Sequence, residues 1–403
     1  MRISIRSFRG NFPRCSSQST NMKRFLYMQY LLAPASFLLL LLMFFYFSGP
    51  KDHPDPETFN SSPQNDNLLT EKDIFSDEEP LPPKCDQNMM VAKIPGFAFL
   101  SSQIQMFLYY RHCHSFPIIL DLPHKCGQAH KPEDILLLLV IKSPPQNYEH
   151  REVLRKTWAK ERMHNGDWIR TIFITGTVGS GFEKERMNKL LALEHQRYND
   201  ILQWDFSESF FNLTLKQILF FEWMDKRCRH VRFLMNGDDD VFAHTENMVE
   251  YLQSLEDNDG SKHLFTGHVI KNAFPIRARW SKYYIPYQLH SKTAYPPYCG
   301  GGGYILSGYT ALVIYNMSKS IPIYPIDDVY MGMCLAAAKI EPTTHMGVRT
   351  LGWYIPSKTL DKYDPCYMKE LLLIHKFSPA EMFIMWHEVH NPKLRCGRQM
   401  LRW

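Results

Sequence analysis

Apolar runs alternate with amphipathic stretches along most of the chain. The runs ILLLLVIK at 135–142, TIFITG at 171–176 and VRFLM at 231–235 predict strands, the first of them buried. Between them, EHREVLRKTWAKERM at 149–163 and LTLKQILFFEWMDKRC at 213–228 place apolar residues three or four positions apart, which predicts helices. This alternation predicts an α/β fold with a mostly parallel sheet and right-handed crossovers.

The N-terminus has a different pattern. Residues 25–47 carry no charge and are long enough to cross a hydrocarbon core of ~30 Å as a helix. Residues 1–24 contain six basic residues and no acidic one, which predicts a cytosolic tail before a signal-anchor. A cleaved signal peptide is the alternative, but its apolar region would be shorter and would end at small residues, whereas Phe44, Phe45 and Phe47 run to the boundary here.

The region after the predicted anchor divides into two parts by composition. Residues 48–84 are rich in Asp, Glu, Pro, Ser and Asn, and they contain too few apolar residues to offset the entropy cost of ordering. We therefore expect a disordered stem at 48–84. No composition change divides residues 85–403, which we expect to form one globular domain.

Cysteines and glycosylation sequons indicate a lumenal or extracellular location for everything after the anchor. Eight of the nine cysteines follow residue 47. An even number there predicts up to four disulfides, whose pairing the spacing does not give. A free core thiol is the alternative for some, such as Cys334 in an apolar helix-like run. Asn60, Asn212 and Asn316 each begin an N-x-S/T sequon.

Three adjacent acids in FLMNGDDDVF follow a predicted strand. Asp238 and Asp240 are two residues apart, so both would face the same side of an extended chain. Two converging carboxylates suit a hard divalent cation, which would also bind a diphosphate that the acids alone repel. The alternative is a solvated Asn-Gly-Asp turn. A turn does not explain three acids between two apolar runs, so we favour the metal site.

Three other stretches carry candidate chemistry. In PIDDVY, Asp327 and Asp328 begin a predicted helix, where a carboxylate serves either as a helix cap or as a general base. The four glycines at 300–303 allow a backbone to approach a ligand closely, although a flexible turn is equally consistent with them. His375 lies in an apolar run, where it is either a core residue or a neutral metal ligand.

Arg151 and Arg155 lie four residues apart on one face of a predicted helix. They either contact a phosphate or base, or they form ion pairs with Glu152 and other acids. Several site types are excluded: no Gly-Lys-Ser/Thr follows the glycines, and dinucleotide, G-x-S-x-G and Cys-x-x-Cys motifs are absent. The basic residues form no stripe, so no nucleic-acid partner is expected, and the net charge of +5 fits an anionic small molecule.

Six motifs, in this order, resemble the β-1,3-galactosyl- and N-acetylglucosaminyltransferases of glycosyltransferase family 31. They are IKSPPQNYEHREVLRKTW, DFSESFFNLTLKQ, FLMNGDDDVF, YPPYCGGGGYILS, PIDDVYMGMCL and IHKFSPAEMFIMW. The forms NGDDDVF, YPPYCGGGG and PIDDVY are more similar to the N-acetylglucosaminyl branch, and closest to members that extend core 1 or poly-N-acetyllactosamine chains. The anchor and stem resemble those of type II Golgi membrane glycosyltransferases, whose catalytic domain lies in the lumen.

The resemblance implies a GT-A fold, in which helices flank a Rossmann-like mixed sheet. It also implies inverting transfer from UDP-N-acetylglucosamine, with Mn²⁺, to the 3-hydroxyl of a terminal galactose. By position, Asp238, Asp240 and His375 would bind the metal, and Asp328 would be the general base. We expect Lys142, Arg151, Arg155 and Asp239 to bind the donor, and Tyr298, Gly301, Gly302 and Asp327 to line the acceptor side.

Two alternatives stay open beside this interpretation. One is a β-1,3-galactosyltransferase that uses UDP-galactose. The other is a non-catalytic, lectin-like lumenal protein that kept the fold, against which the intact acids at 238–240 and 327–328 argue. The sequence indicates neither the acceptor glycan class nor the oligomeric state.

Overall fold

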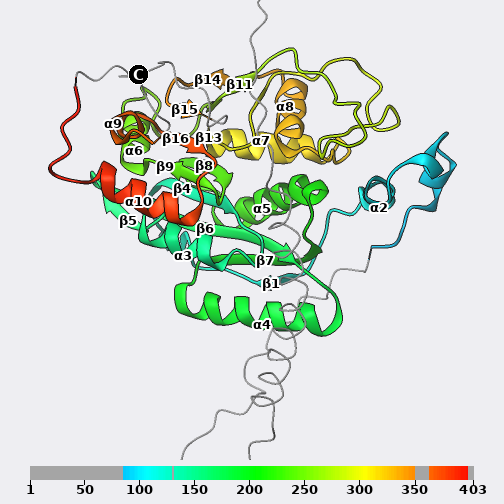
Figure 1. Cartoon of the computed structure of the whole chain (residues 1–403), viewed down its shortest axis with the longest axis horizontal. Coiled ribbons are helices and arrows are strands. Elements are labelled where there is room, and N and C mark those ends of the chain that lie inside the picture. Colours follow the sequence, from blue (N-terminus) through cyan, green and yellow to red (C-terminus); the bar gives the residue numbers. More distant parts are fainter. Residues whose placement is uncertain (1–84, 129–130, 350–362, 398–403) are drawn as a thin grey trace, which may run out of the picture. The chain divides into compact units, whose positions relative to one another are not determined.

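A nine-stranded mixed sheet forms the centre of the computed structural model, which describes residues 85–128, 131–349 and 363–397 (Figure 1). The strand order is β1 (Ile118–Leu120), β7 (Ile201–Ser207), β6 (Asp167–Thr177), β4 (Ile135–Lys142), β8 (Phe233–Asp238), β13 (Gly303–Ser307), β10 (Phe265–Gly267) and β14 (Thr343–Thr344), with β5 (Arg162–His164) paired to β6. The four strands β7, β6, β4 and β8 are parallel. The prediction of a mostly parallel sheet is right for these four, but β13 is antiparallel to β8, and β10 is antiparallel to β13.

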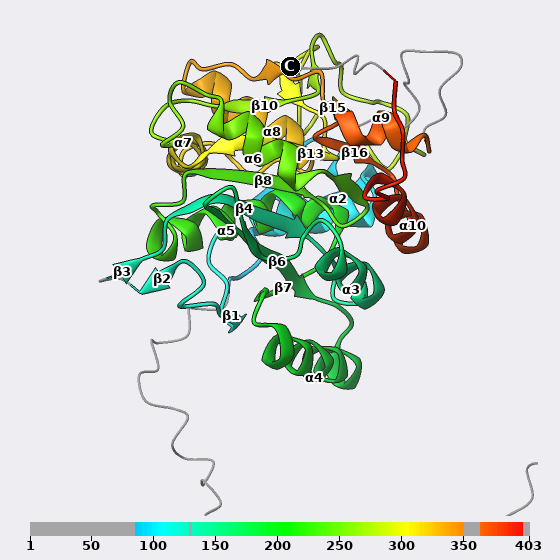
Figure 2. The ribbon, with the colours of Figure 1, turned by 90° about the vertical axis from the view of Figure 1, so that its left-hand side faces the viewer.

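Two hydrophobic cores lie on opposite faces of this sheet, and the alternation of side chains along β4 feeds both. Leu138 and Val140 belong to the core with α5 (Leu213–Arg227), α7 (Gly308–Ser318) and α8 (Asp327–Ala337). Leu137 and Leu139 belong to the core with α3 (Tyr148–Lys156), α6 (Thr245–Gln253), α9 (Pro365–Glu370) and α10 (Pro379–Val389). Figure 2 shows the sheet from a second side. Every residue of β4 is buried because both faces are covered, which explains its uninterrupted apolar sequence.

The predicted helix at 149–163 is shorter than expected. It ends at Lys156, and Arg162–His164 forms β5 instead. The backbone of Thr157 leaves the helical region, with φ −121° and ψ −125°. This turn directs Trp158 into the core, where it is fully buried and its indole N–H donates to the Met382 sulfur at 3.3 Å. The free energy gained by burying the indole therefore exceeds the free energy that continuing the helix would give.

Small sheets and short helices complete the described part of the chain. The three-stranded sheet β15 (Val348–Arg349), β16 (Leu373–His375) and β9 (Val241–Ala243) joins the C-terminal region to the segment after the acid triplet. The pair β11 (Val269–Ile270) and β12 (Tyr298–Cys299) encloses a long connection. The remaining elements are η1 (Met89–Lys93), η2 (Phe97–Phe99), η3 (Phe210–Asn212), α2 (Ser102–Tyr110), α4 (Gly181–Tyr198), β2 (Gly127–Gln128) and β3 (Lys131–Pro132).

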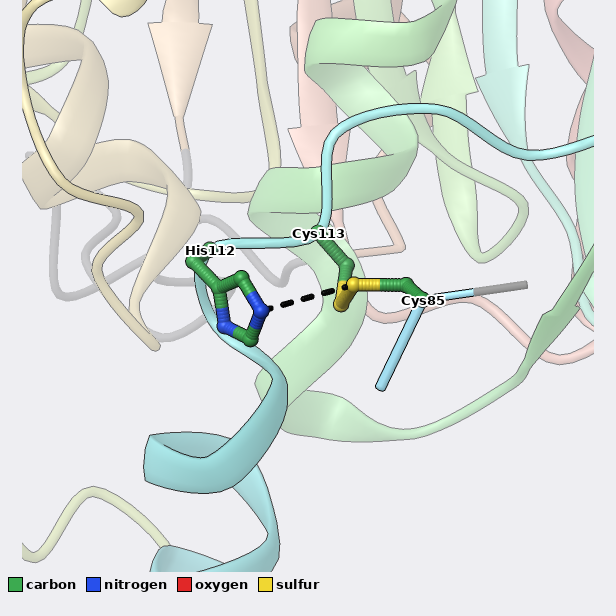
Figure 3. A group of neighbouring side chains, drawn as sticks. All are labelled: Cys85, His112 and Cys113. Carbon is green, nitrogen blue, oxygen red and sulfur yellow. Dashed lines mark hydrogen bonds between the residues drawn. A yellow bond between two sulfur atoms is a disulfide. The ribbon is translucent and has the colours of Figure 1, made fainter. Parts of the chain in front are cut away.

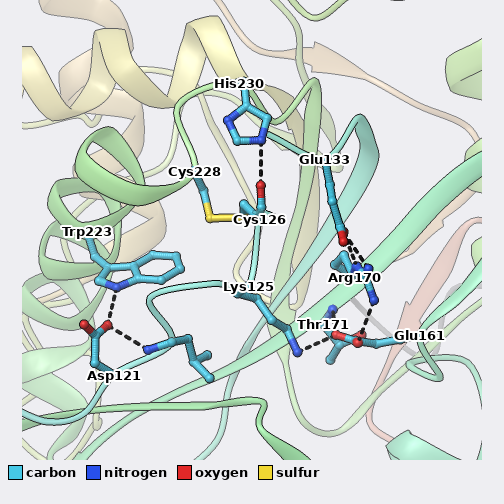
Figure 4. The surroundings of a disulfide bond; sticks show 11 residues. Asp121, Lys125, Cys126, Glu133, Glu161, Arg170, Thr171, Trp223, Cys228 and His230 are labelled. Carbon is cyan, nitrogen blue, oxygen red and sulfur yellow. Dashed lines mark hydrogen bonds and ion pairs between the residues drawn. A yellow bond between two sulfur atoms is a disulfide. The ribbon is translucent and has the colours of Figure 1, made fainter. Parts of the chain in front are cut away.

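Three disulfides form where up to four were predicted: Cys85–Cys113, Cys126–Cys228 and Cys366–Cys396. The second joins residues 102 positions apart and lies beside the ion pair of Lys125 with Glu161 (Figure 4). Cys299 and Cys334 are free and buried, as the core-thiol alternative predicted for Cys334.

His112 lies beside the Cys85–Cys113 disulfide, with Nε2 3.6 Å from the Cys85 sulfur (Figure 3). Two cysteines and a histidine at such distances would suit zinc if the sulfurs were thiolates. Because the two sulfurs are bonded to each other, neither is a thiolate here. This group is therefore a structural cross-link.

The predicted cytosolic tail, the anchor at 25–47, the stem and the Asn60 sequon lie outside the described residues. Among the residues that are described, no helix is long and apolar enough to span a bilayer. Of the other sequon asparagines, Asn316 is exposed on α7, and Asn212 is half-buried where its amide donates to the Ser207 carbonyl at 2.8 Å.

Candidate active site

The acid triplet and the glycine run lie on neighbouring strands. Asp238 is the last residue of β8, and the register of β8 with β13 places Gly303 opposite Gly237. The backbone N–H of Asp238 faces the Gly302 carbonyl at 3.4 Å. The two motifs therefore meet at the carboxyl end of the parallel strands, where α/β sheets bind ligands.

Asp238, Asp240 and His375 form a compact group. His375 Nε2 lies 2.9 Å from Asp240 Oδ1 and 3.8 Å from Asp238 Oδ2. Pairing of β16 with β9 sets His375 opposite Val241, directly after the triplet. One ligand atom from each of the three residues lies within 4.8 Å of the others. Two carboxylates and one imidazole are a donor set that fits Mn²⁺.

The two acids of this group have different electrostatic surroundings. Burial raises the pKa of Asp238, although the charge of Lys142 opposes the shift. Burial would also raise the pKa of Asp240, but its hydrogen bond with His375 and the charge of that ring hold it below the usual value. Asp240 therefore carries its negative charge readily, as a metal ligand must.

Asp239 turns away from this group. Its Oδ2 accepts hydrogen bonds from Ser143 Oγ at 2.7 Å and Asn147 Nδ2 at 2.9 Å. His150 Nδ1 lies 3.1 Å from the Asp239 carbonyl. Asp239 thus fixes the loop after β4 to the acid turn, and its contact with the donor stays a prediction.

Arg151 and Arg155 form ion pairs inside the protein, which was the alternative to donor binding. Arg151 donates to both carboxylate oxygens of Glu194, at 2.7 and 2.8 Å, and to Ser143 Oγ at 3.0 Å. Arg155 donates to both oxygens of Asp200, at 2.7 and 2.9 Å. Arg151 is 1 % exposed. Arg151 therefore braces the loop that carries Ser143 and Pro144, and Arg155 ties α3 to Asp200. Donor binding by these two side chains stays a prediction.

Lys142 lies between Asp238 and the first acid of α8, Asp327. Its Nζ is 3.1 Å from Asp238 Oδ1 and 2.7 Å from Asp327 Oδ2, and the residue is 4 % exposed. Lys142 and Asp327 were predicted to contact donor and acceptor, respectively. In the structure each neutralises the other.

Asp328 has the environment of a general base. Its Oδ1 accepts the N–H of Val329 at 2.8 Å and so satisfies one of the free N–H groups in the first turn of α8. Burial and the neighbouring Asp327 charge raise the pKa of its carboxyl to about 7. A base works best when its pKa lies near the operating pH, because it is then unprotonated yet still able to bind a proton.

Comparison with known proteins identifies the family of this chain. Residues 149–346 match the family model described as galactosyltransferase. The chain is 49% identical over 321 residues to human N-acetyllactosaminide β-1,3-N-acetylglucosaminyltransferase 3, a match that spans 79% of this chain and 84% of that protein. This chain belongs to the galactosyltransferase family, glycosyltransferase family 31.

Two further relatives carry the same kind of name as the first. A human acetylgalactosaminyl-O-glycosyl-glycoprotein β-1,3-N-acetylglucosaminyltransferase is 44% identical over 78% of this chain and 81% of its own. The rat UDP-GlcNAc:βGal β-1,3-N-acetylglucosaminyltransferase 7 is 41% identical over 78% of this chain and 77% of its own. The resemblance predicted from six motifs is thereby confirmed.

In this family 31 protein, the glycine run passes between the Asp238–Asp240–His375 group and Asp328. A Cβ on Gly302 would lie 2.8 Å from His375 Cβ and Cγ, and one on Gly301 would lie 3.1 Å from Asp328 Oδ2. Tyr298 lies just before the run, in β12. The glycines therefore make room for His375 and Asp328 themselves, in addition to any ligand.

Sequence reasoning missed the residues that support the site. Ser143 and Asn147 hold Asp239, and Glu194 holds Arg151. The motif that contains Ser143 and Asn147 was recognised without their partners. Glu194 lies 43 positions from Arg151, near the C-terminal end of α4, and no local pattern marks it.

Proposed function

We propose that this protein transfers N-acetylglucosamine from UDP-N-acetylglucosamine to the 3-hydroxyl of a terminal galactose, with inversion at the anomeric carbon. The names of its relatives supply the donor, the linkage and the acceptor sugar. The observation that carries the proposal is that Asp328 lies across the glycine run from the Asp238–Asp240–His375 group. That spacing suits a leaving group on one side and an acceptor hydroxyl on the other.

The residues on the donor side would hold the departing nucleotide. Asp238, Asp240 and His375 would bind Mn²⁺, which when present neutralises charge on the UDP diphosphate. Asp239 and its partners Ser143 and Asn147 keep the acid turn in place. This arrangement fixes the metal ligands before substrate binds, so little reorganisation accompanies the reaction.

Asp328 would act on the acceptor side. A sugar hydroxyl is a poor nucleophile at neutral pH, so a base must take its proton as the bond to the anomeric carbon forms. The Oδ2 of Asp328 faces the glycine run, whereas Asp327 is paired with Lys142. One displacement needs one base and no covalent nucleophile, and it converts an α-linked donor into a β-linked product.

The proposal includes the GT-A form of the fold and a Golgi location. The mixed sheet with helices on both faces supports the first. The uncharged segment at 25–47, the basic tail and the three disulfides support a type II membrane protein with its catalytic domain, 85–403, in the lumen.

The test is an assay of the secreted form, residues 85–403, with UDP-N-acetylglucosamine or UDP-galactose, Mn²⁺ and galactose-terminated acceptors. We expect a β-1,3-linked N-acetylglucosamine product, identified by mass and linkage analysis. Transfer from UDP-galactose alone would show the galactosyltransferase alternative to be correct. Glycan binding without transfer from either donor would favour the lectin-like alternative.

Two variants separate the proposed roles. Asp328→Asn should abolish transfer while UDP binding in the presence of Mn²⁺ persists. Asp240→Asn should weaken UDP binding in Mn²⁺ and leave it unchanged in EDTA. Asp257→Asn is the matched control, because Asp257 pairs with Lys262 at the surface, where the Asp257 side chain is 47% exposed.

A further inference from the structure

The connection between β11 and β12 is long and has a defined conformation. Residues 271–297 contain five basic residues and no acidic one. Arg277 donates to the Ile285 carbonyl at 2.6 Å and to the His290 carbonyl at 2.7 Å. The backbone N–H of Tyr295 donates to the Ala273 carbonyl at 2.9 Å. Ordered loops of this length are usually functional.

This connection exposes large aromatic rings. Trp280 is 90% exposed, Tyr287 is 68% exposed and Phe274 is 65% exposed. Leaving such rings in water forgoes the free energy of their burial, and clustered exposure marks a binding surface. The electron-rich face of an aromatic ring attracts the weakly positive C–H groups of a sugar, so such rings suit glycans.

The cations of the connection have no carboxylate partner among the described residues. Arg279 is exposed and forms no hydrogen bond or ion pair with any described side chain. The Nζ of Lys282 lies over the rings of Tyr283 and Phe210, 4.8 and 5.4 Å from their centroids. A cationic surface that also lacks acids is complementary to an anion.

The connection ends beside the proposed base. At its C-terminal end it packs on α8, where a Cβ on Gly332 would lie 2.6 Å from the Pro297 carbonyl oxygen and 2.8 Å from Tyr298 Cβ. Tyr298 lies close to Asp328 and Tyr283. Burial is the largest cause of the raised pKa of Tyr298, and the charges of Asp328 and Tyr283 raise this pKa further. A glycan whose terminal galactose reaches Asp328 would therefore have its next sugars over this connection.

We propose that residues 271–297 form an acceptor subsite, in which Trp280 and neighbouring rings bind sugars beyond the reacting galactose and Arg279 and Lys282 bind an anionic substituent on those sugars. This inference rests on the proposed function, because it takes Asp328 as the place of the acceptor hydroxyl. Sulfate esters and carboxylated branch sugars share the required negative charge. Arginine favours both groups because its planar fork donates two hydrogen bonds at once.

The test compares three acceptors of equal length that end in galactose: a neutral one, one with a sulfate ester on the second sugar, and one with a carboxylated sugar branching from it. We expect kcat/KM for at least one anionic acceptor to exceed that for the neutral one by about tenfold, the effect of one good ionic contact. The ratio should fall as salt rises, because exposed charges are screened.

Variants assign the effect to this connection. The double variant Arg279→Ala, Lys282→Ala should bring the anionic-to-neutral ratio close to one. Trp280→Ala should raise KM for all three acceptors. Lys189→Ala, an exposed cation on α4, is the control and should leave the ratio unchanged.

Direct titration of the same three glycans separates this inference from the proposed function. Preferential binding of an anionic glycan that the double variant loses supports the subsite. If no glycan receives a sugar in the same experiment, the proposed transferase function is contradicted while the subsite stands. Equal binding and equal kcat/KM for the three glycans would overturn the subsite. A ratio that the double variant leaves intact, or equal binding of an acidic peptide without sugar, would overturn it too.

Discussion

Lys142 Nζ lies 2.7 Å from Asp327 Oδ2, although the two residues are 185 positions apart. The same amine lies 3.1 Å from Asp238 Oδ1. Burial alone would lower the pKa of Lys142, but the charges of Asp238 and Asp327 raise it well above its ordinary value. One buried lysine thus ties the acid group on β8 to the helix that carries the proposed base.

Replacing this lysine should lower the stability of the protein. Lys142→Met would leave Asp238 and Asp327 without their shared partner, and we expect the free energy of unfolding to fall by about 3–5 kcal/mol. Urea unfolding measures this loss. Lys226→Met, which removes an exposed pair with Glu222, should cost less than about 1 kcal/mol. Equal losses in the two variants would contradict the bridging role.

The raised pKa of Asp328 predicts how activity depends on pH. A carboxyl with a pKa of about 7 is protonated below that value and cannot accept the acceptor's proton. The kcat/KM should therefore fall with decreasing pH, with a midpoint at about 7 or somewhat below it, because a bound cation would lower this raised pKa. A profile that stays flat down to pH 5, measured with saturating Mn²⁺, would exclude Asp328 as the base.

The glycine run allows the effect of steric clash to be tested separately from that of backbone strain. A methyl group on Gly302 would lie 2.8 Å from His375 Cβ, so Gly302→Ala should displace the histidine and weaken Mn²⁺-dependent UDP binding. Gly301→Ala meets Asp328 Oδ2 at 3.1 Å and should lower kcat more than UDP affinity. Neither glycine has a positive φ, so backbone strain does not contribute.

Gly397→Ala is the control for these two variants, because among the described residues no atom outside its chain neighbours lies within 4 Å of the added carbon. It should leave both measurements unchanged. If Gly302→Ala bound UDP as tightly as Gly397→Ala, the close packing of His375 against the glycine run would have no functional role.

The cysteines predict how many thiols of the secreted form react with maleimide under each condition. Burial raises the pKa of Cys299 and Cys334 to about 12, so these free thiols should not react in the folded protein. Maleimide labelling followed by mass spectrometry should find no label on the folded chain and two labels after unfolding without reductant. Eight labels should appear after reduction. A count of zero in the unfolded, unreduced chain would indicate a fourth disulfide.

The sequence predicted best where one local pattern decides the structure. The apolar run at 135–142 predicted a buried strand, and it is β4. The spacing of Asp238 and Asp240 placed both on one side, and both lie near His375. His375 itself was ambiguous, because its role depends on the pairing of β16 with β9, which no local pattern specifies.

Contacts between residues far apart in the sequence decided the features that local patterns did not predict. Whether Arg151 faces a ligand or an acid depends on Glu194, which belongs to another helix. Helix 149–163 was predicted too long because its apolar periodicity continues past Trp158. The helix ends at Lys156, and the Trp158 side chain packs in the core against Met382 of α10. Lys142 was placed at the site, but its two carboxylate partners come from β8 and α8 and could not be paired from spacing.

The attachment of residues 271–297 has an evolutionary consequence. They join the rest of the protein between β11 and β12, whereas the acid triplet begins at the last residue of β8 and His375 ends β16. Exposed side chains of this connection, such as Trp280, can therefore change while the residues that contact Asp238 and His375 stay the same. Gene duplicates could diverge in the glycans that they extend while conserving one reaction, and grafting this segment between paralogues offers a direct way to exchange their preferences.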